Sequence, residues 1–344
     1  MADTTTPILL IGAGPIGLEL AVGLKQASLA YTHLEGRQIG HTISWWAPQT
    51  RFFSSNDRIA IAGLPLVTPD GSKATREQYL AYLRTVVQHY KLDIRTYEPV
   101  STINPTPAGF EVLTTTPTAT HRYLAARVIL ATGGTETPHL LSIPGEDLPH
   151  VSHYLQDPHA YFRRKLTIVG GRNSAVEAAL RAHHAGAAVT ISYRQASLPE
   201  KSIKYWLLPE INSLIKSGAI TAHFQTAPER ITPTTVALRR ASGDVVEVEA
   251  DHVLLLTGYD ADMSLFRAAG VTLLPPADSP TFDPTTMETN VPGLYVAGTA
   301  ARGSQQSKYE LYIENTHTHV HRIIAHLQGR KAHTNAPEYS LSES

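Results

Sequence analysis

Two glycine-rich loops, at residues 12–17 and 170–175, constrain the fold of this chain more than any other feature. Each follows a short apolar run and precedes a segment with helical periodicity. A glycine turn between a buried strand and a helix is the signature of a dinucleotide-binding βαβ unit. The loops therefore predict an α/β protein with two Rossmann-like domains, each a doubly wound, three-layer sandwich, and two bound dinucleotides.

The glycines of the first loop have separate tasks. Gly12 makes the tight turn, Gly14 lets the backbone approach a pyrophosphate, and Gly17 lets the helix pack closely on its strand. A glycine turn that holds no ligand is the alternative, but it would leave the surrounding strand, helix and acidic residue as coincidences. We therefore expect a nucleotide at this loop.

The residues around these glycines fit the same site. Pro15 falls in the first turn of the following helix, where its missing N–H costs nothing, and Ile16 comes next. Glu35 ends the second strand and is followed by Gly36. An acid at this position accepts hydrogen bonds from the hydroxyls of a ribose.

The second loop departs from the usual pattern, because Arg172 stands where the second glycine is expected. A side chain there limits the approach of the backbone to a phosphate, although the guanidinium itself is able to contact one. After the next strand comes Tyr193-Arg194, with no acid for a ribose. Arg194, assisted by Lys204, is thus a candidate for a 2′-phosphate, which favours NADPH over NADH. An ordinary surface arginine is the alternative.

The order of motifs resembles that of flavoprotein reductases of the thioredoxin-reductase type. The matching pieces are the Gly12 loop, Ala131-Thr132-Gly133, the Gly170 loop, and Pro292-Gly293-Leu294-Tyr295-Val296-Ala297-Gly298. In that family the first and last pieces belong to an FAD domain, into which an NADPH domain is inserted. The resemblance implies an FAD domain at residues 1–154 and 262–344, and an NADPH domain at residues 155–261.

A more specific resemblance is to the YpdA-type bacillithiol disulfide reductases. It rests on stretches such as Phe52-Phe53-Ser54-Ser55, Pro144-Gly145-Glu146-Asp147-Leu148-Pro149, Ser202-Ile203-Lys204 and Ile313-Glu314-Asn315. That subfamily has a cysteine in its first glycine loop, where this chain has Ile16, and thioredoxin reductases use a Cys-x-x-Cys pair that is also missing. The chain has no cysteine. The resemblance therefore implies transfer from NADPH to flavin but not disulfide reduction.

The resemblance and the loops together give two sets of candidate site residues. The FAD set is Gly12, Gly14, Pro15, Ile16, Gly17, Glu35, Gly36, Phe53, Thr132, Gly133, Gly298, Thr299, Ile313 and Glu314. The NADPH set is Gly170, Gly171, Arg172, Asn173, Ser174, Tyr193, Arg194, Lys204 and Gly258. The aromatic residues Trp45, Trp46, Phe52 and Phe53 either cover the flavin or belong to the core. No catalytic side chain is named, because flavin-mediated hydride transfer requires none.

Composition excludes several functions. The absence of cysteine excludes disulfides, thiolate metal sites and thiol catalysis. A net charge of -1 without a basic stripe gives no support to nucleic-acid binding. No signal peptide or membrane span is evident, so a cytoplasmic protein is expected. His317 and His321 share a helix face as a potential metal pair, but a solvated or packing role is favoured and no metal is expected.

The sequence thus predicts an FAD-dependent NADPH oxidoreductase whose partner is a small molecule or an electron carrier. The expected acceptor is a quinone, a small oxidant, or ferredoxin or flavodoxin. One alternative is a flavin monooxygenase, which would couple NADPH and oxygen to a substrate. Another is a non-catalytic redox sensor, which would bind both nucleotides with negligible turnover. The resemblance also implies a homo-oligomer, a dimer or larger.

Overall fold

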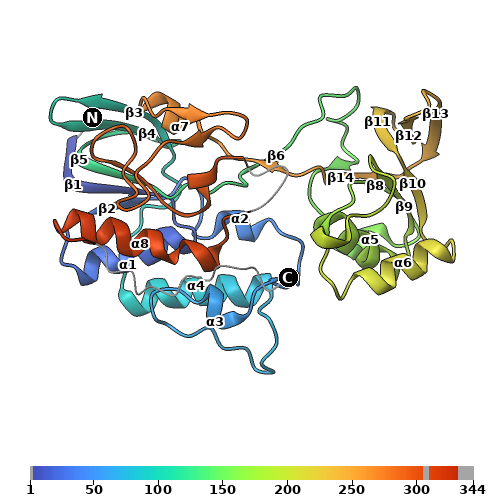
Figure 1. The fold of residues 1–344 in the computed structure, drawn as a ribbon, viewed down its shortest axis with the longest axis horizontal. Helices are drawn as coiled ribbons and strands as arrows, with labels where there is room; N and C mark the ends of the chain where they lie inside the picture. Colours follow the sequence, from blue (N-terminus) through green and yellow to red (C-terminus); the bar gives the residue numbers. More distant parts are fainter. Residues whose placement is uncertain (1–2, 305–309, 332–344) are drawn as a thin grey trace. The chain divides into compact units, whose positions relative to one another are not determined.

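The computed structural model describes residues 3–304 and 310–331, and these fold as two compact units (Figure 1). The first unit comprises the chain up to Trp45, Gln49–Thr137, and the described residues from Tyr259 onward. The second unit is Pro138–Gly258 together with Trp46–Pro48. The second unit is thus inserted into the first, as the sequence predicted.

The first unit is built on a six-stranded sheet in the order β2-β1-β5-β4-β3, with β18 also paired to β5. The strands are β1 (Asp3–Ile11), β2 (Thr32–Leu34), β3 (Val100–Thr106), β4 (Gly109–Thr115), β5 (Thr120–Leu130) and β18 (Leu294–Val296). Strand β5 pairs in parallel with β1 and β18 and antiparallel with β4. The parallel part of the sheet is the Rossmann-like core that the first glycine loop predicted.

The helices of the first unit are α1 (Pro15–Gln26), α2 (His41–Ser44), α3 (Asn56–Ile59), α4 (Arg76–Tyr90), α7 (Ser264–Ala268) and α8 (Ile313–Leu327), with a 3-10 turn η3 (Gly298–Arg302). Helices α1 and α8 lie side by side (Figure 1). Their close approach depends on Gly23, since a Cβ atom there would lie 3.3 Å from Cγ1 of Ile324. This packing places the N-terminal ends of both helices in one unit with the first glycine loop.

Strand β1 shows why its residues form the centre of the sheet. Leu9 and Leu10 are fully buried, and Ile8 and Ile11 are nearly so. The strand lies between β2 and β5, in parallel register with both. A continuous apolar run is typical of a parallel strand that is covered on both faces.

The second unit contains a five-stranded parallel sheet in the order β10-β9-β8-β14-β7. Its strands are β7 (Val151–Ser152), β8 (Lys165–Val169), β9 (Ala188–Tyr193), β10 (Thr221–Phe224) and β14 (His252–Leu255). Its helices are α5 (Asn173–His184) and α6 (Leu208–Lys216), with 3-10 turns η1 (Pro158–Tyr161) and η2 (Glu200–Ser202). An antiparallel sheet of β11 (Thr226–Ile231), β12 (Thr235–Arg240) and β13 (Val245–Glu249) completes it. The second Rossmann-like domain is therefore confirmed.

The first crossing between the units falls between Thr137 and Pro138, earlier than the expected position near residue 154. The reason is apolar packing, because Leu141, Ile143, Leu148 and Val151 pack against a core cluster of the second unit. The return crossing follows Gly258, close to the expected residue 261. Two short strands, β6 (Thr137–Pro138) and β15 (Tyr259–Asp260), pair at these crossings.

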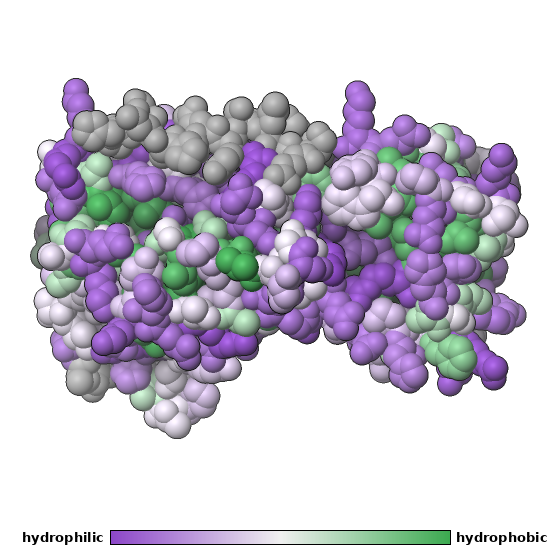
Figure 2. Space-filling model, turned by 90° about the horizontal axis from the view of Figure 1, so that it is seen from below, coloured by the Kyte–Doolittle hydropathy of each residue, from purple (hydrophilic) through white to green (hydrophobic). Residues whose placement is uncertain are grey.

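The short strand β17 (Ser279–Pro280) pairs with β16 (Leu273–Leu274). On the face drawn in Figure 2, hydrophobic side chains form small separate groups among polar ones. No helix within residues 3–304 and 310–331 is long and apolar enough to cross a membrane.

Candidate functional site

The three glycines of the first loop meet different surroundings. A Cβ atom at Gly12 would clash with the carbonyl of Ala131, and one at Gly17 would clash with the carbonyl of Gly12. Gly12 also has a φ of 103°, a conformation that side chains disfavour. At Gly14, by contrast, nothing in the part of the chain that the structure describes lies within 4 Å of the position of a Cβ atom. Two glycines thus permit close packing, and the third leaves open space beside the backbone, as a bound pyrophosphate requires.

Helix α1 begins beside that open space. Gly14 is its N-cap residue and Pro15 its first residue, and no side chain within residues 3–304 and 310–331 caps the N–H groups of the first turn. These uncapped groups and the positive end of the helix dipole favour an anion at this point. The arrangement therefore fits a pyrophosphate.

Glu35 connects strand β2 to the glycine loop. Its Oε2 atom accepts a hydrogen bond from the backbone N–H of Ala13 at 2.6 Å, and its Oε1 atom accepts one from that of Arg37 at 2.8 Å. A carboxylate has about four acceptor positions, so this geometry leaves capacity for ribose hydroxyls. Gly36 follows against Pro99, since a Cβ atom there would lie 3.4 Å from Cα of Pro99. Glu35 thus also orders the loop, a role that the sequence did not indicate.

His33 is a second support of the loop, and the sequence analysis missed it. Its Nε2 atom lies 2.9 Å from the carbonyl oxygen of Gly12, and its side chain is 1% exposed. Burial lowers the pKa of His33 to about 4, although the bond to Gly12 acts in the opposite direction. The ring is therefore neutral at pH 7, and its Nε2–H donates to the carbonyl of the turn. The signal available in the sequence was its place in strand β2, two residues before Glu35.

Two further segments, around Thr132 and Gly298, lie close to the first glycine loop and the start of α1. Gly298 opens η3, and a Cβ atom on it would lie 3.4 Å from Cβ of Ile16 in α1. A Cβ atom on Gly134 would lie 2.9 Å from the carbonyl oxygen of Thr299. Gly12 in the first glycine loop packs against Ala131, the residue before Thr132. The structure therefore brings the three segments predicted around FAD together.

Thr132 and Gly133, beside the first glycine loop, have features that fit a bound cofactor. The Oγ1 atom of Thr132 is buried, yet it has no hydrogen-bond partner among the residues that the structure describes. Gly133 has a φ of 88°, and no atom of the described residues lies within 4 Å of the position of a Cβ atom on it. Because buried hydroxyls are normally hydrogen-bonded, this orphaned oxygen fits a polar atom of a bound cofactor.

Helix α8 supplies the remaining candidates, Ile313 and Glu314. Glu314 is 3% exposed, and its Oε2 atom accepts a hydrogen bond from the hydroxyl of Ser54. This contact joins the start of α8 to the segment that carries Phe53. Phe53 itself is half-buried, with the Nζ atom of Lys73 5.2 Å from the centre of its ring.

Two of the aromatic residues considered for the flavin face, Phe52 and Trp45, have different neighbours in the structure. Phe52 is 6% exposed and packs on Tyr79, with 4.4 Å between ring centres. Trp45 lies 5.1 Å from the ring centre of Tyr259. Phe52 therefore belongs to the core, and a flavin contact by Phe53 stays a prediction.

The second glycine loop also depends on close packing. Gly170 has a φ of 142°, and a Cβ atom there would lie 2.5 Å from the carbonyl oxygen of Leu256. A Cβ atom at Gly171 would lie 2.5 Å from the ring of Tyr193. Helix α5 follows with Arg172 as its N-cap residue and no side-chain cap. This helix start is open to an anion in the same way as that of α1.

Lys204 differs from its expected role. It is 8% exposed, and its Nζ atom lies 2.9 Å from Oε2 of Glu177. Its backbone N–H donates to Oδ1 of Asn173 at 2.6 Å. A buried amine that is paired with a carboxylate is not presented to a 2′-phosphate at the surface, so Lys204 instead orders the start of α5. Arg194 and Ser174 are exposed, and recognition of a 2′-phosphate by Arg194 stays a prediction.

The remaining candidate of the second unit is Gly258, which has a φ of 110° and no described residue within 4 Å of the position of a Cβ atom. Within the described ranges, no group of histidine and acidic residues has the arrangement of a metal site. The potential metal ligand His317 lies 2.7 Å from Glu19, and its helix partner His321 is exposed.

The fold and the two glycine loops, each followed by an open helix start, define a two-domain flavoprotein that works with a pyridine nucleotide. A family model described as pyridine nucleotide-disulphide oxidoreductase matches residues 9–298, and the chain belongs to this family. The cofactors of such an enzyme, FAD and NADPH, are those that the two loops predicted.

Three relatives illustrate the range of the family. The chain is 34% identical to Bacilliredoxin reductase Bdr from Bacillus subtilis, over 94% of this chain and 98% of the relative. It is similar to the solved Bacillithiol Disulfide Reductase Bdr (YpdA) from Bacillus cereus, with a TM-score of 0.90, 32% identity, and coverage of 95% and 100%. It is also 25% identical to a Ferredoxin--NADP reductase from Ignicoccus hospitalis, over 84% and 88% of the two chains.

Proposed function

We propose that the first unit binds FAD, the second binds NADPH, and electrons pass from NADPH through FAD to an acceptor without a protein thiol. The candidate acceptors are a quinone, a small oxidant, or a carrier such as ferredoxin or flavodoxin. The observation that carries the proposal is Ile16. It occupies the first turn of α1, where the resembling disulfide reductases have cysteine, in a chain that contains no cysteine.

Ile16 is well fitted to its position. It is 6% exposed and faces Gly298, whose added Cβ atom would lie 3.4 Å from that of Ile16. Disulfide reduction proceeds by attack of a thiolate on a disulfide sulfur. An aliphatic side chain here supplies none, which supports an acceptor that takes electrons directly.

The residues of the first unit bind and orient. The N–H groups at the start of α1 bind the pyrophosphate beside Gly14, and Glu35 accepts hydrogen bonds from the ribose hydroxyls. Thr132 offers its hydroxyl, and the start of α8 presents backbone N–H groups to an electron-rich edge. When bound, FAD supplies a centre that accepts a hydride and releases electrons to the acceptor.

The residues of the second unit select the nucleotide. The N–H groups at the start of α5 bind the pyrophosphate, and Gly170 and Gly171 keep the turn tight. Arg194 recognises the 2′-phosphate, because a guanidinium pairs with phosphate in a bidentate manner.

An anaerobic stopped-flow screen tests the proposal. The enzyme is reduced with NADPH and mixed with quinones, ferredoxin, flavodoxin or bacillithiol disulfide, while flavin absorbance is recorded. We expect rapid reoxidation by at least one non-thiol acceptor and none by the disulfide beyond an acceptor-free control. An Ile16→Cys variant, measured in parallel, shows whether the assay detects a thiol route.

Each other result has a defined meaning. Rapid turnover of bacillithiol disulfide by the wild-type protein would overturn the thiol-independent route. Oxygen-dependent coupling of NADPH to a substrate would identify a monooxygenase. Negligible NADPH oxidation with every acceptor, despite bound FAD, would identify a sensor. A homo-oligomer and a cytoplasmic location stay predictions.

A further inference from the structure

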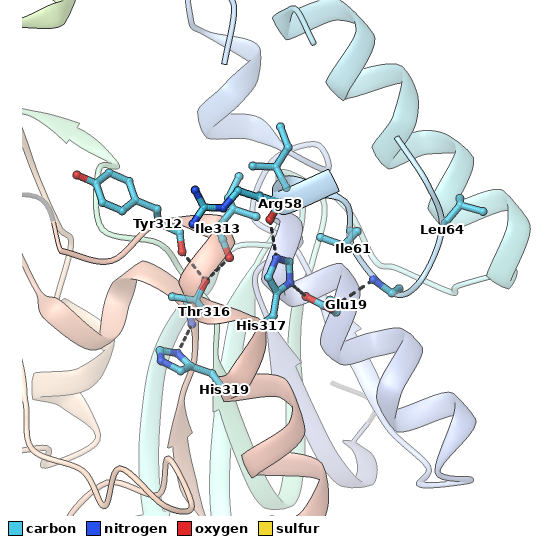
Figure 3. Close-up of polar contacts among 12 residues, drawn as sticks. Glu19, Arg58, Ile61, Leu64, Tyr312, Ile313, Thr316, His317 and His319 are labelled. Carbon is cyan, nitrogen blue, oxygen red and sulfur yellow. Dashed lines mark hydrogen bonds and ion pairs between the residues drawn. The ribbon is translucent and has the colours of Figure 1, made fainter. Parts of the chain in front are cut away.

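His317 in the second turn of α8 makes two hydrogen bonds to other parts of the first unit (Figure 3). Its Nδ1 atom lies 2.7 Å from Oε2 of Glu19 in α1, and its Nε2 atom lies 3.0 Å from the backbone carbonyl oxygen of Arg58 in α3. The side chains of His317 and Glu19 are only 14% and 12% exposed. Both ring nitrogens are thus engaged away from bulk water.

The chemistry of these partners fixes the protonation state of the ring. A peptide carbonyl only accepts hydrogen bonds, and an ionised carboxylate also only accepts. A neutral imidazole has a single N–H, so it satisfies one of these partners and directs a lone pair at the other. An imidazolium has two N–H groups and satisfies both.

A protonated Glu19 is the alternative source of the second hydrogen. However, both oxygens of Glu19 already face donors, since Oε1 accepts the backbone N–H of Ala62 at 3.3 Å and Oε2 lies 2.7 Å from Nδ1 of His317. The proton therefore belongs to the ring.

The surroundings of His317 agree with a cation. Burial acts to lower the pKa of His317, but the hydrogen bond and charge of Glu19, the carbonyl of Arg58 and the charge of Glu314 outweigh it, so the pKa is raised. The groups that face this site are Glu19 on α1, Glu314 on α8, the backbone carbonyl of Arg58 on α3, and Tyr79 and Tyr82 on α4. Both tyrosines have raised pKa values and are neutral, with burial as the largest cause.

The position of this ion pair relates it to the candidate FAD residues. Glu19 follows Gly17 by two residues on α1, and His317 follows Glu314 by three residues on α8. Residues 54–59, which we call the α3 segment, are held near both ends, because Ser54 donates to Glu314 and the carbonyl of Arg58 accepts from His317. The ion pair thus joins the two helices whose N-terminal ends form the proposed FAD cradle.

We propose that His317 is a positioning residue, held as an imidazolium, that fastens the α3 segment to α1 and α8 and thereby keeps the FAD cradle closed on its cofactor. The inference rests on the proposed function in one respect, namely that FAD binds the first unit.

The first test needs no variant for its main readout. The FAD-loaded protein is labelled with ¹⁵N-histidine, and ring nitrogens are followed by long-range ¹H–¹⁵N correlation. At pH 7, above the ordinary histidine pKa of about 6.5, we expect the ring of His317 to carry a proton on both nitrogens. This signal disappears in His317→Gln and persists in His321→Gln, a matched change at an exposed position of the same helix. A neutral His317 at pH 7 in the FAD-loaded protein overturns the inference.

The second test measures FAD affinity by fluorescence titration after cofactor removal and reconstitution. Loss of one charge-assisted hydrogen bond, worth about 1.5–3 kcal/mol, predicts that His317→Gln raises the Kd by about tenfold or more. His321→Gln should stay within about twofold of wild type. Glu19→Gln should raise the Kd in the same way, and the double variant should add little, since both changes break one interaction.

The outcomes separate this inference from the proposed function. If the wild-type protein binds no FAD, the proposed function fails. If it binds FAD but His317→Gln binds it equally well, the positioning role fails. Should His317→Gln fold poorly, His317→Lys retains charge and donors. Recovery of FAD affinity in that variant supports the proposal, and affinity no better than that of Glu19→Gln contradicts it.

Discussion

The Nδ1 atom of His319 accepts a hydrogen bond from the backbone N–H of Gly298, with 3.2 Å between the two nitrogen atoms. Burial, and secondarily the charge of Arg322, lowers the pKa of His319 to about 4. The ring is therefore neutral at pH 7, and its lone pair is available to the N–H group. A side chain of α8 thus fixes the point at which η3 turns toward Ile16, in the middle of the proposed FAD cradle.

Replacing this acceptor should weaken both the fold and cofactor binding. In His319→Leu the N–H of Gly298 becomes a buried donor without a partner, which costs about 1–3 kcal/mol. We expect a lower free energy of unfolding in urea and faster release of FAD. His319→Asn restores an acceptor on a short side chain and should recover part of the loss. Equal behaviour of the two variants would show that the hydrogen bond contributes nothing.

The two buried histidines should make the protein acid-sensitive. His33 and His319 both have folded-state pKa values of about 4, lowered mainly by burial. In the unfolded chain histidine titrates near 6.5. Between these values the unfolded state binds more protons, so stability is full above about pH 6.5 and falls as the pH drops toward 4. At pH 5 the loss is about 2 kcal/mol for each histidine.

Urea unfolding at pH 7 and pH 5 measures this effect. A double variant, His33→Gln with His319→Asn, should show a smaller difference between the two pH values than wild type. An unchanged difference would assign the acid sensitivity to other groups.

Alanine at two glycines of the first loop should have different consequences. Gly17→Ala places a methyl group against the carbonyl of Gly12, so we expect strong destabilisation of the first unit. Gly14→Ala meets open space and has an ordinary φ of -72°, so the fold should be kept while the approach of a pyrophosphate is blocked. Thermal unfolding and flavin content check this contrast. Normal flavin binding in Gly14→Ala would move the pyrophosphate elsewhere.

Arg194→Ala should raise the KM for NADPH far more than the KM for NADH, by at least about tenfold, because only NADPH carries the 2′-phosphate. Arg240→Ala is a suitable control, since it removes an exposed arginine of the same unit from strand β12. Steady-state kinetics with both nucleotides measure the ratio. Similar changes for NADPH and NADH in Arg194→Ala would show that the 2′-phosphate is recognised by other residues.

Local patterns predicted the fold well. The apolar run before Gly12, the glycine spacing and Pro15 led to β1 and α1, and the same pattern around Gly170 led to β8 and α5. These features act over a few residues, so they are readable from sequence. The first crossing was misplaced because the membership of residues 138–154 depends on packing against strand β14, which lies far along the chain.

The supports of the site were less predictable. His317 and Glu19 are separated by 298 positions, and no local pattern relates them. For the histidine run at residues 317–321, the sequence left open a metal site or a solvated or packing role. In the structure His317 pairs with Glu19, His319 accepts the N–H of Gly298, and His321 is exposed. Lys204 was expected at a phosphate because its charge is visible in the sequence, but its pairing with Glu177 is not.

The isoleucine in the first turn of α1 has a consequence for how such an enzyme tolerates its surroundings. A reductase that depends on a reactive sulfur is silenced when peroxide oxidises it or an electrophile alkylates it. With an aliphatic group in that place and no cysteine elsewhere, this protein presents no such target. On the proposed thiol-independent route, neither reaction would remove a group that its electron transfer needs.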